Sequence, residues 1–335
     1  MGPAELDTLG QADSWEGVKA VVVGFAGAGF AATDNLTHLG ATVTAFDTAH
    51  GDDVTRERAE LLGILGATVT FVGDDPVPLP DDTDVLVVTQ ARWYSDDLVE
   101  QAMARRVPVW GGIELAWRLR NREAVAPWLV VAGHRGRTTT ARMTEAILRA
   151  AGERPVCVGG EDLPIVEAVM DPTVWDAVVV DADPLELHYT YSMSAESAVV
   201  LNVQPGASTL GTMLQAYERA QRACVYNAAD PLTEALVRDA DVVEGARAIG
   251  FTLGTPGVGM VGVVEDLLVD RAFIEERSTS AAELCTLEEL AATLGVEVVD
   301  LPPFYVQDAL AAAALARAHG VSQVAVRDGL RGFTP

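Results

Sequence analysis

The sequence predicts an α/β protein with two consecutive units, each built on a parallel sheet. Short apolar runs that end in glycine or aspartate alternate with helical patterns along the chain. Two of these runs lead into glycine-rich turns, and a polar stretch separates the first series from the second. Such alternation is typical of doubly wound parallel sheets, and 335 residues provide enough chain for two hydrophobic cores.

The first series begins with the apolar run Lys19–Gly24, which we interpret as a buried strand. A tight turn over 24–29 leads into a helix over 30–39, with Gly40 as its C-cap. The next strand covers 41–46, and Asp47 closes it. The same alternation predicts helices over 56–65, 98–105 and 113–120 and strands over 68–72, 84–89 and 107–110.

The polar connection 121–127 is the expected boundary between a domain over 1–122 and a domain over 123–335. The second series starts with the strand Trp128–Ala132, followed by the loop Gly133–Thr140 and a helix over 141–151. Further strands are expected over 177–180, 198–202, 223–226, 248–251 and 260–265, and helices over 305–319 and 322–330.

The first glycine turn has the spacing G-x-x-G-x-G, which differs from the G-x-G-x-x-G dinucleotide fingerprint. Taken alone, Gly24 and Gly29 are equally explained by close packing of a helix on a strand. Asp47 at the end of the second strand favours a binding role, because that position commonly accepts hydrogen bonds from a ribose or base. We therefore predict that these three residues bind part of a nucleotide ligand.

The second turn has the outline of a phosphate-binding loop, G-x-x-G-K-S/T, between a strand and a helix. Gly133, Gly136, Thr138 and Thr139 fit this outline, but Arg137 stands where the lysine is expected, and Lys19 is the only lysine of the chain. Arginine keeps the positive charge but presents a wide planar fork.

Asp181 directly follows a predicted apolar strand beyond the loop, and a carboxylate there suits magnesium. The alternative is an ordinary turn at the end of a strand. With Asp181, Thr138 would complete a metal site.

Composition excludes some functions. A net charge of −26 argues against nucleic acid as a partner, because polyanion binding needs a basic surface. The acidity is explained by a solvated surface or by a basic partner. No apolar run is long enough to span a membrane, and residues 1–14 are acidic, unlike a secretory signal. Three widely spaced cysteines fit a reducing cytoplasm, where we expect the protein to be located.

A resemblance to a known family runs from about residue 15 to the end and is carried by four segments, 109–117, 163–169, 245–270 and 309–320. By these segments the chain resembles the Mur ligase family, and within it the D-glutamate-adding ligases of actinobacteria. It implies a Rossmann-like, UDP-binding first domain and a P-loop-type central ATPase domain, with ATP and Mg²⁺ as cofactors and a UDP-linked muramoyl ligand. The third domain of the family would begin near 332–335, so we expect it to be absent.

The sequence departs from the family pattern in the motifs that carry the family's chemistry. The family's T-N-G-K-S/T-T corresponds to 134–139, its G-N-I/V-G to 159–162, its E-x-S-S-F-Q-L to 181–187 and its N-x-x-x-D-H-x-D to 202–208. The lysine of Y-x-x-x-K falls near Gln221, after Tyr217. Asp308 takes the place of an adenine-contacting asparagine, and Thr89 begins the segment that replaces the uridine-holding S-P-G. Asp181 is the one carboxylate left for magnesium.

Three functions follow from this resemblance. The first is an impaired relative of an ATP-dependent ligase of peptidoglycan precursor synthesis. The second is a non-catalytic nucleotide-binding or scaffold protein, a pseudoenzyme. The third is a working enzyme whose rearranged site uses Arg137 and Asp181 as catalytic residues. The sequence does not identify a protein partner.

Overall fold

We analysed a computed structural model of the chain, which describes residues 6–48, 53–73, 77–90, 95–123, 125–160 and 162–335. The chain forms two compact units. The first contains Met1–Val125, Glu161–Thr173 and Leu185–Met193, and the second contains Ala126–Gly160, Val174–Pro184 and Ser194–Pro335. Two later segments therefore belong to the first unit. The sequence-based division at 122/123 stays a prediction of functional domains.

The first unit has a five-stranded sheet with the order β3-β2-β1-β4-β5, and all its strand pairs are parallel. This order matches the first five positions of the Rossmann strand order, 3-2-1-4-5-6. The strands are β1 (Lys19–Val23), β2 (Thr42–Thr48), β3 (Thr68–Val72), β4 (Val85–Val88) and β5 (Val109–Gly111). The helices are α2 (Gly27–His38), α3 (Asp53–Leu65), α4 (Ser95–Ala104), α5 (Gly112–Leu119), α7 (Ile165–Met170) and α8 (Pro184–His188).

A buried carboxylate ties the 185–193 segment to the first unit. Glu114 in α5 is fully buried and pairs with Arg118. It also accepts hydrogen bonds from the backbone N–H groups of Tyr191 and Ser192 at 2.7 and 2.9 Å. Gly111 is needed beside this segment, because a Cβ there would lie 2.6 Å from the Glu186 carbonyl oxygen.

The second unit has a nine-stranded sheet with the order β14-β13-β12-β11-β10-β9-β6-β8-β7. Its strands are β6 (Trp128–Ala132), β7 (Pro155–Gly159), β8 (Ala177–Asp181), β9 (Ser197–Val200), β10 (Ala223–Asn227), β11 (Arg247–Phe251), β12 (Met260–Val264), β13 (Leu267–Asp270) and β14 (Ala282–Thr286). The pairs from β7 to β12 are parallel, whereas β13 pairs antiparallel with β12 and β14. The strands that the sequence predicted up to residue 265 therefore pair in parallel, as expected. The antiparallel pairs involve β13 and β14, which were not predicted, and a tight hairpin joins β12 to β13.

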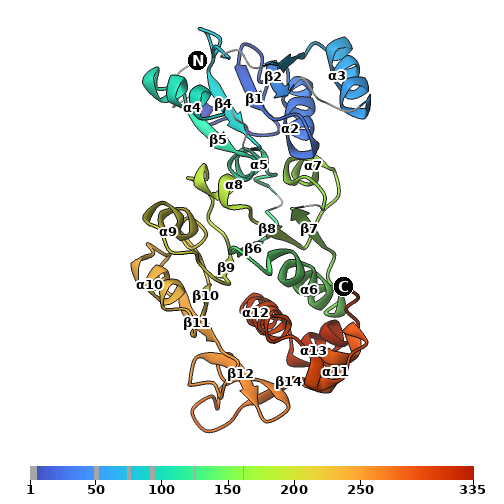
Figure 1. Ribbon diagram of the computed structural model, residues 1–335, viewed down its shortest axis with the longest axis vertical. Helices are drawn as coiled ribbons and strands as arrows, with labels where there is room; N and C mark the ends of the chain where they lie inside the picture. The colour runs from blue at the N-terminus through green and yellow to red at the C-terminus, as the bar shows by residue number, and fades with distance from the viewer. Residues whose placement is uncertain (1–5, 49–52, 74–76, 91–94, 124, 161) are drawn as a thin grey trace. The chain divides into compact units, whose positions relative to one another are not determined.

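Helices cover both faces of the strands of the second unit (Figure 1). On one side lie α6 (Arg137–Ala150), α12 (Pro303–His319) and α13 (Gln323–Arg331), which share one hydrophobic core with the sheet. On the other side lie α9 (Ala207–Leu214) and α10 (Pro231–Asp239). The helix α11 (Leu287–Leu294) follows β14 and contacts α13. Alanine dominates the buried face of α12, which allows this helix to pack closely on its neighbours.

Candidate functional site

The loop after β6 ends in a helix that begins earlier than the sequence predicts. We expected the helix from residue 141, but α6 starts at Arg137. Arg137, Thr138 and Thr139 therefore form its first turn, whose backbone N–H groups have no partner within the helix. Gly133 and Gly136 have φ values of +142° and +87°, which favour glycine and set the turn of the loop.

The topology brings three strand ends together at this loop. β6 lies between β8 and β9, and all three strands are parallel. The order of connections reverses at β6, and such a switch point forms a crevice at the carboxyl ends of the strands. The loop follows β6, Asp181 ends β8, and Asn202 follows β9, so these residues meet at one edge of the sheet.

Arg137 and Asp181 form an ion pair inside this crevice. The Arg137 Nε donates to Asp181 Oδ1 at 2.8 Å, and its Nη1 donates to the Gly133 carbonyl oxygen at 3.0 Å. The Thr138 hydroxyl donates to the other oxygen, Asp181 Oδ2, at 2.6 Å. Asp181 is fully buried, and the arginine side chain is 18 % exposed. Both carboxylate oxygens of Asp181 are thus engaged by groups of α6.

These residues do not fit Mg²⁺ in this arrangement. A magnesium ion needs oxygen ligands in octahedral geometry, usually with one or two carboxylates. Here a guanidinium cation already neutralises Asp181, and it also reaches Asp183 Oδ2 at 3.5 Å. The structure brings Thr138 and Asp181 together, as the sequence predicts, but through a hydrogen bond to each other. Within the described residues, no group of three or more His, Cys, Asp or Glu side chains is arranged to hold a metal ion.

Asn202 occupies the first part of the loop, a role that sequence reasoning missed. Its Oδ1 accepts hydrogen bonds from the N–H groups of His134 and Arg135 at 3.0 and 3.1 Å, and its Nδ2 donates to the Arg135 carbonyl oxygen at 2.9 Å. A phosphate bound by these amides would have to displace the asparagine. The sequence did offer a signal for this role, because Asn202 comes just after β9, and β9 pairs with β6, the strand that precedes the loop.

Asp308 in α12 lies over the end of the loop. A Cβ on Gly136 would stand 2.3 Å from Asp308 Oδ1, so only glycine allows this approach. The side chain is 5 % exposed. Burial raises the pKa of Asp308 to about 7, and the Thr140 hydroxyl offsets part of that rise. The sequence-predicted adenine position therefore lies at the loop, with a carboxyl group that ionises near neutral pH.

Gln221 lies at the other end of the strands, so our placement of the missing family lysine is wrong. Its side-chain amide donates to the Ser194 carbonyl oxygen at 3.0 Å, before β9 begins. Tyr217 is fully buried, and its hydroxyl accepts from Val200 N–H at 3.1 Å. Since α9 runs back from the loop edge, residues that follow it lie at the amino ends of the strands.

In the first unit, the predicted substrate residues meet at the switch point between β1 and β4. Gly24, with φ +85°, follows β1, and a Cβ on Gly29 would lie 1.9 Å from the Gly24 carbonyl oxygen. The Asp47 carboxylate accepts from Phe25 N–H at 3.2 Å and from Thr48 N–H at 2.8 Å. The Thr89 hydroxyl donates to the Val23 carbonyl oxygen at 2.9 Å. Asp47 and Thr89 thus hold the glycine turn, and a role in ligand binding stays a prediction.

A Rossmann-like sheet and a P-loop-type sheet, with a glycine-rich loop at the switch point of each, define the Mur ligase class of fold. A Neisseria meningitidis ligase, titled UDP-N-acetylmuramate:L-alanyl-gamma-D-glutamyl-meso-diaminopimelate ligase, has a similar fold. Its TM-score is 0.59 at 18 % identity, over 95 % of this chain and 98 % of that one. No family model matches the sequence.

Curated relatives identify the family within that class. The chain is 44 % identical to the UDP-N-acetylmuramoylalanine–D-glutamate ligase of Streptomyces avermitilis over 335 aligned residues and 45 % identical to that of Streptomyces coelicolor over 334. Each match covers 96 % of this chain and 68 % of the relative. The chain belongs to the UDP-N-acetylmuramoylalanine–D-glutamate ligase family. Among the described helices, none combines the length and apolar character needed to cross a membrane.

Proposed function

We propose that this chain is a nucleotide-binding member of the D-glutamate-adding ligase family that does not perform the ligation at a useful rate. The ion pair between Arg137 and Asp181 carries this proposal. The printed name of the relatives supports a UDP-N-acetylmuramoyl compound and D-glutamate as ligands. ATP as the third ligand, and peptidoglycan precursor synthesis in the cytoplasm as the setting, follow from the resemblance to the Mur ligases and are part of the proposal.

The chemistry of such a ligation explains why the ion pair matters. ATP phosphorylates a carboxylate, and an amine then displaces phosphate from the acyl phosphate. Catalysis depends on preorganised cations that stabilise the charge developing on the transferred phosphoryl group. In this chain the cation of the loop is bound to Asp181 and to Gly133, so its charge is already neutralised.

The same contacts leave a route for nucleotide binding. The first turn of α6 offers backbone N–H groups at its positive end, which suits a phosphate without any metal. We expect weak binding, because Asn202 fills the earlier part of the loop. A rearranged working enzyme would instead need Arg137 to release Asp181 during turnover.

Phosphate release tests the proposal. We expect less than about 1 turnover per second, the low end of ordinary enzymes, with Mg-ATP, UDP-N-acetylmuramoyl-L-alanine and D-glutamate. Arg137→Lys alone should stay equally inactive, because residues that act as a unit fail together. Arg149→Lys, an exposed substitution on the same helix, is the matched control. Substrate-dependent turnover at or above that rate in the unmodified chain would contradict the proposal and favour the working enzyme.

A further inference from the structure

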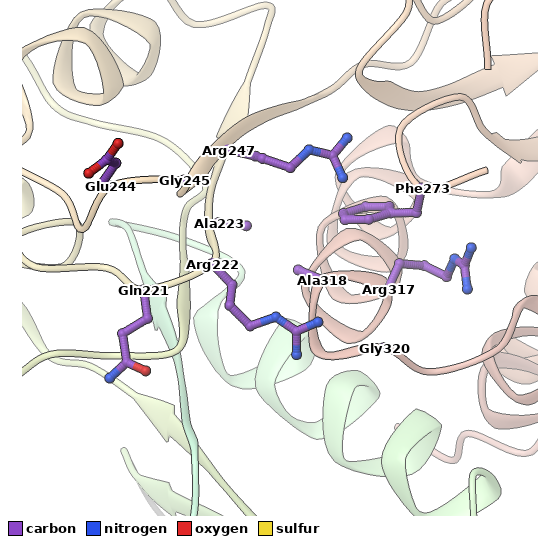
Figure 2. Close-up of a pocket in the computed structure, with 10 residues that line it drawn as sticks. All are labelled: Gln221, Arg222, Ala223, Glu244, Gly245, Arg247, Phe273, Arg317, Ala318 and Gly320. Carbon is purple, nitrogen blue, oxygen red and sulfur yellow. The ribbon is translucent and has the colours of Figure 1, made fainter. Parts of the chain in front are cut away.

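A pocket of about 490 Å³ lies in the second unit, away from the phosphate-type loop (Figure 2). Arg222 directly precedes β10, and Arg247 is the first residue of β11. The loop after β6 lies at the carboxyl ends of these parallel strands, so the pocket lies at the opposite edge of the sheet. The C-terminal end of α12, with Arg317 and Ala318, completes the wall.

Two arginines lie against one aromatic ring in this pocket, and a third arginine lines the same pocket. The guanidinium carbons of Arg247 and Arg317 lie 5.2 and 5.8 Å from the centre of the Phe273 ring. Figure 2 shows Arg222 on the same side of the pocket, whereas Glu244 lies on the far side. Cation–π contacts of this kind hold guanidinium groups in place while leaving their N–H donors available.

The three arginines differ in how their charge is balanced. Arg317 donates to Asp270 Oδ2 at 2.9 Å, and Arg222 donates to Glu196 Oε1 at 3.1 Å. Arg247 has no carboxylate within ion-pair distance among the described residues, where its one hydrogen-bond acceptor is the Ala272 carbonyl oxygen. Burial, followed by the like charge of Arg277, lowers its pKa, and the charge of Asp270 offsets part of that shift.

This arrangement is unexpected in so acidic a chain. The sequence has 49 acidic and 23 basic residues, so a basic side chain readily finds a carboxylate. Arg222 and Arg317 are each paired with a carboxylate, whereas Arg247 has none at ion-pair distance among the described residues, so its guanidinium is the group that an incoming anion would pair with. A planar fork of N–H donors recognises carboxylate and phosphate oxygens in pairs.

We propose that this pocket is a binding site for a small oxyanion, a carboxylate or a phosphate, held chiefly by Arg247 with Arg222 and Arg317 beside it. Ala223 and Ala318 leave room for the body of the ligand. The site is separate from the loop of the proposed nucleotide function and does not depend on it.

Calorimetric titration at low salt tests this site, with citrate and inorganic phosphate as separate probes for the two oxyanion chemistries. Arg247→Gln should weaken binding about tenfold or more, because a charge-assisted hydrogen bond is lost. Arg238→Gln is the matched control, since this exposed arginine of α10 lies in the same unit and its loss changes the net charge equally. Arg137→Gln tests binding at the phosphate-type loop instead.

The expected result is binding of at least one probe, retained within about twofold in Arg238→Gln but weakened about tenfold or more in Arg247→Gln. Thermal unfolding of each variant shows that it is folded, and the exposed Arg222→Gln provides a second substitution at the same pocket. A wild-type chain that binds neither probe would overturn the proposal. So would binding that survives Arg247→Gln, or that Arg238→Gln weakens equally.

Discussion

Asp308, beside the phosphate-type loop, makes the stability of the protein depend on pH. Its pKa of about 7 lies above the 3.8 of an ordinary aspartate, because burial disfavours the charged form. Between these two values the folded protein binds more protons than the unfolded chain. The stability that this group contributes is therefore fully present below pH 3.8 and is lost as the pH rises through 7.

We expect Asp308→Asn to remove this part of the pH dependence. The free energy of unfolding of the unmodified chain should fall by up to about 1.4 kcal/mol for each unit of rise in pH between about 4 and 7 on account of this group. His319 acts in the same direction, since Glu196 raises its pKa above the ordinary 6.5, so the variant should keep a slope only towards pH 7 and above. Denaturant unfolding at pH 5, 6 and 7 provides the measurement. The surface variant Asp300→Asn should keep the full slope, and an Asp308→Asn slope equal to the wild-type slope would contradict the assignment.

For individual residues, the sequence predicted which ones lie at the candidate site after β6, but it did not predict which of them contact each other. A glycine-rich loop after an apolar strand predicted Gly133, Gly136 and Asp181 at one edge, because parallel strands share that edge. The ion pair of Arg137 could not be predicted, since it depends on α6 beginning at residue 137 and not at 141. Threonines in the first helical turn resemble a loop in sequence, which hid that start.

At the scale of the elements, the close contact of α2 with the turn after β1 can be tested by adding one methyl group. Gly29→Ala places a methyl group 1.9 Å from the Gly24 carbonyl oxygen, and backbone must move to relieve this overlap. We expect a loss of about 3 kcal/mol or more in the free energy of unfolding.

Gly63→Ala is the matched control for that substitution. Gly63 lies in α3, where an added methyl group meets no atom within 4 Å. It should stabilise the protein by about 0.5–1 kcal/mol, through the helix propensity of alanine. Urea unfolding measures both variants. Equal stabilities for the two would show that the close approach of α2 does not exist.

The sequence predicted the long, buried elements better than the short ones. The strands β1, β6 and β8 are apolar runs on both faces, and α12 is a long alanine-rich pattern, so each was predicted near its observed position. β7 begins with a proline and lies at the edge of the sheet, and it was not predicted. The hairpin of β12 and β13 was also missed, because a two-residue turn resembles an interruption within one strand.

For the whole molecule, the two units imply two separable ligands. We predict weak UDP binding in the first unit, and Asp47→Ala should weaken it about tenfold or more, because the carboxylate fixes the Phe25 and Thr48 amides that shape the turn. ATP binding in the second unit should stay unchanged. Calorimetric titrations with UDP and with ATP measure both affinities.

Asp53→Ala, at an exposed aspartate of α3, provides the control for charge. Equal UDP affinity in Asp47→Ala and the parent chain, or tight binding by both, would show that Asp47 has no part in the site. Loss of ATP binding in the same variant would show that the units are not independent.

Gly160 constrains which side chains this part of the candidate site can accept. A Cβ at that position would lie 2.6 Å from Asp181 Oδ2, the oxygen that Thr138 also holds. Any larger residue at 160, an asparagine included, is therefore disfavoured while Thr138 and Arg137 keep Asp181 in place. Replacing Arg137 alone would leave Asp181 Oδ2 bound to the Thr138 hydroxyl, so the carboxylate itself has to move before a side chain fits at 160. Substitutions at 160 and at the groups that hold Asp181 should consequently be non-additive.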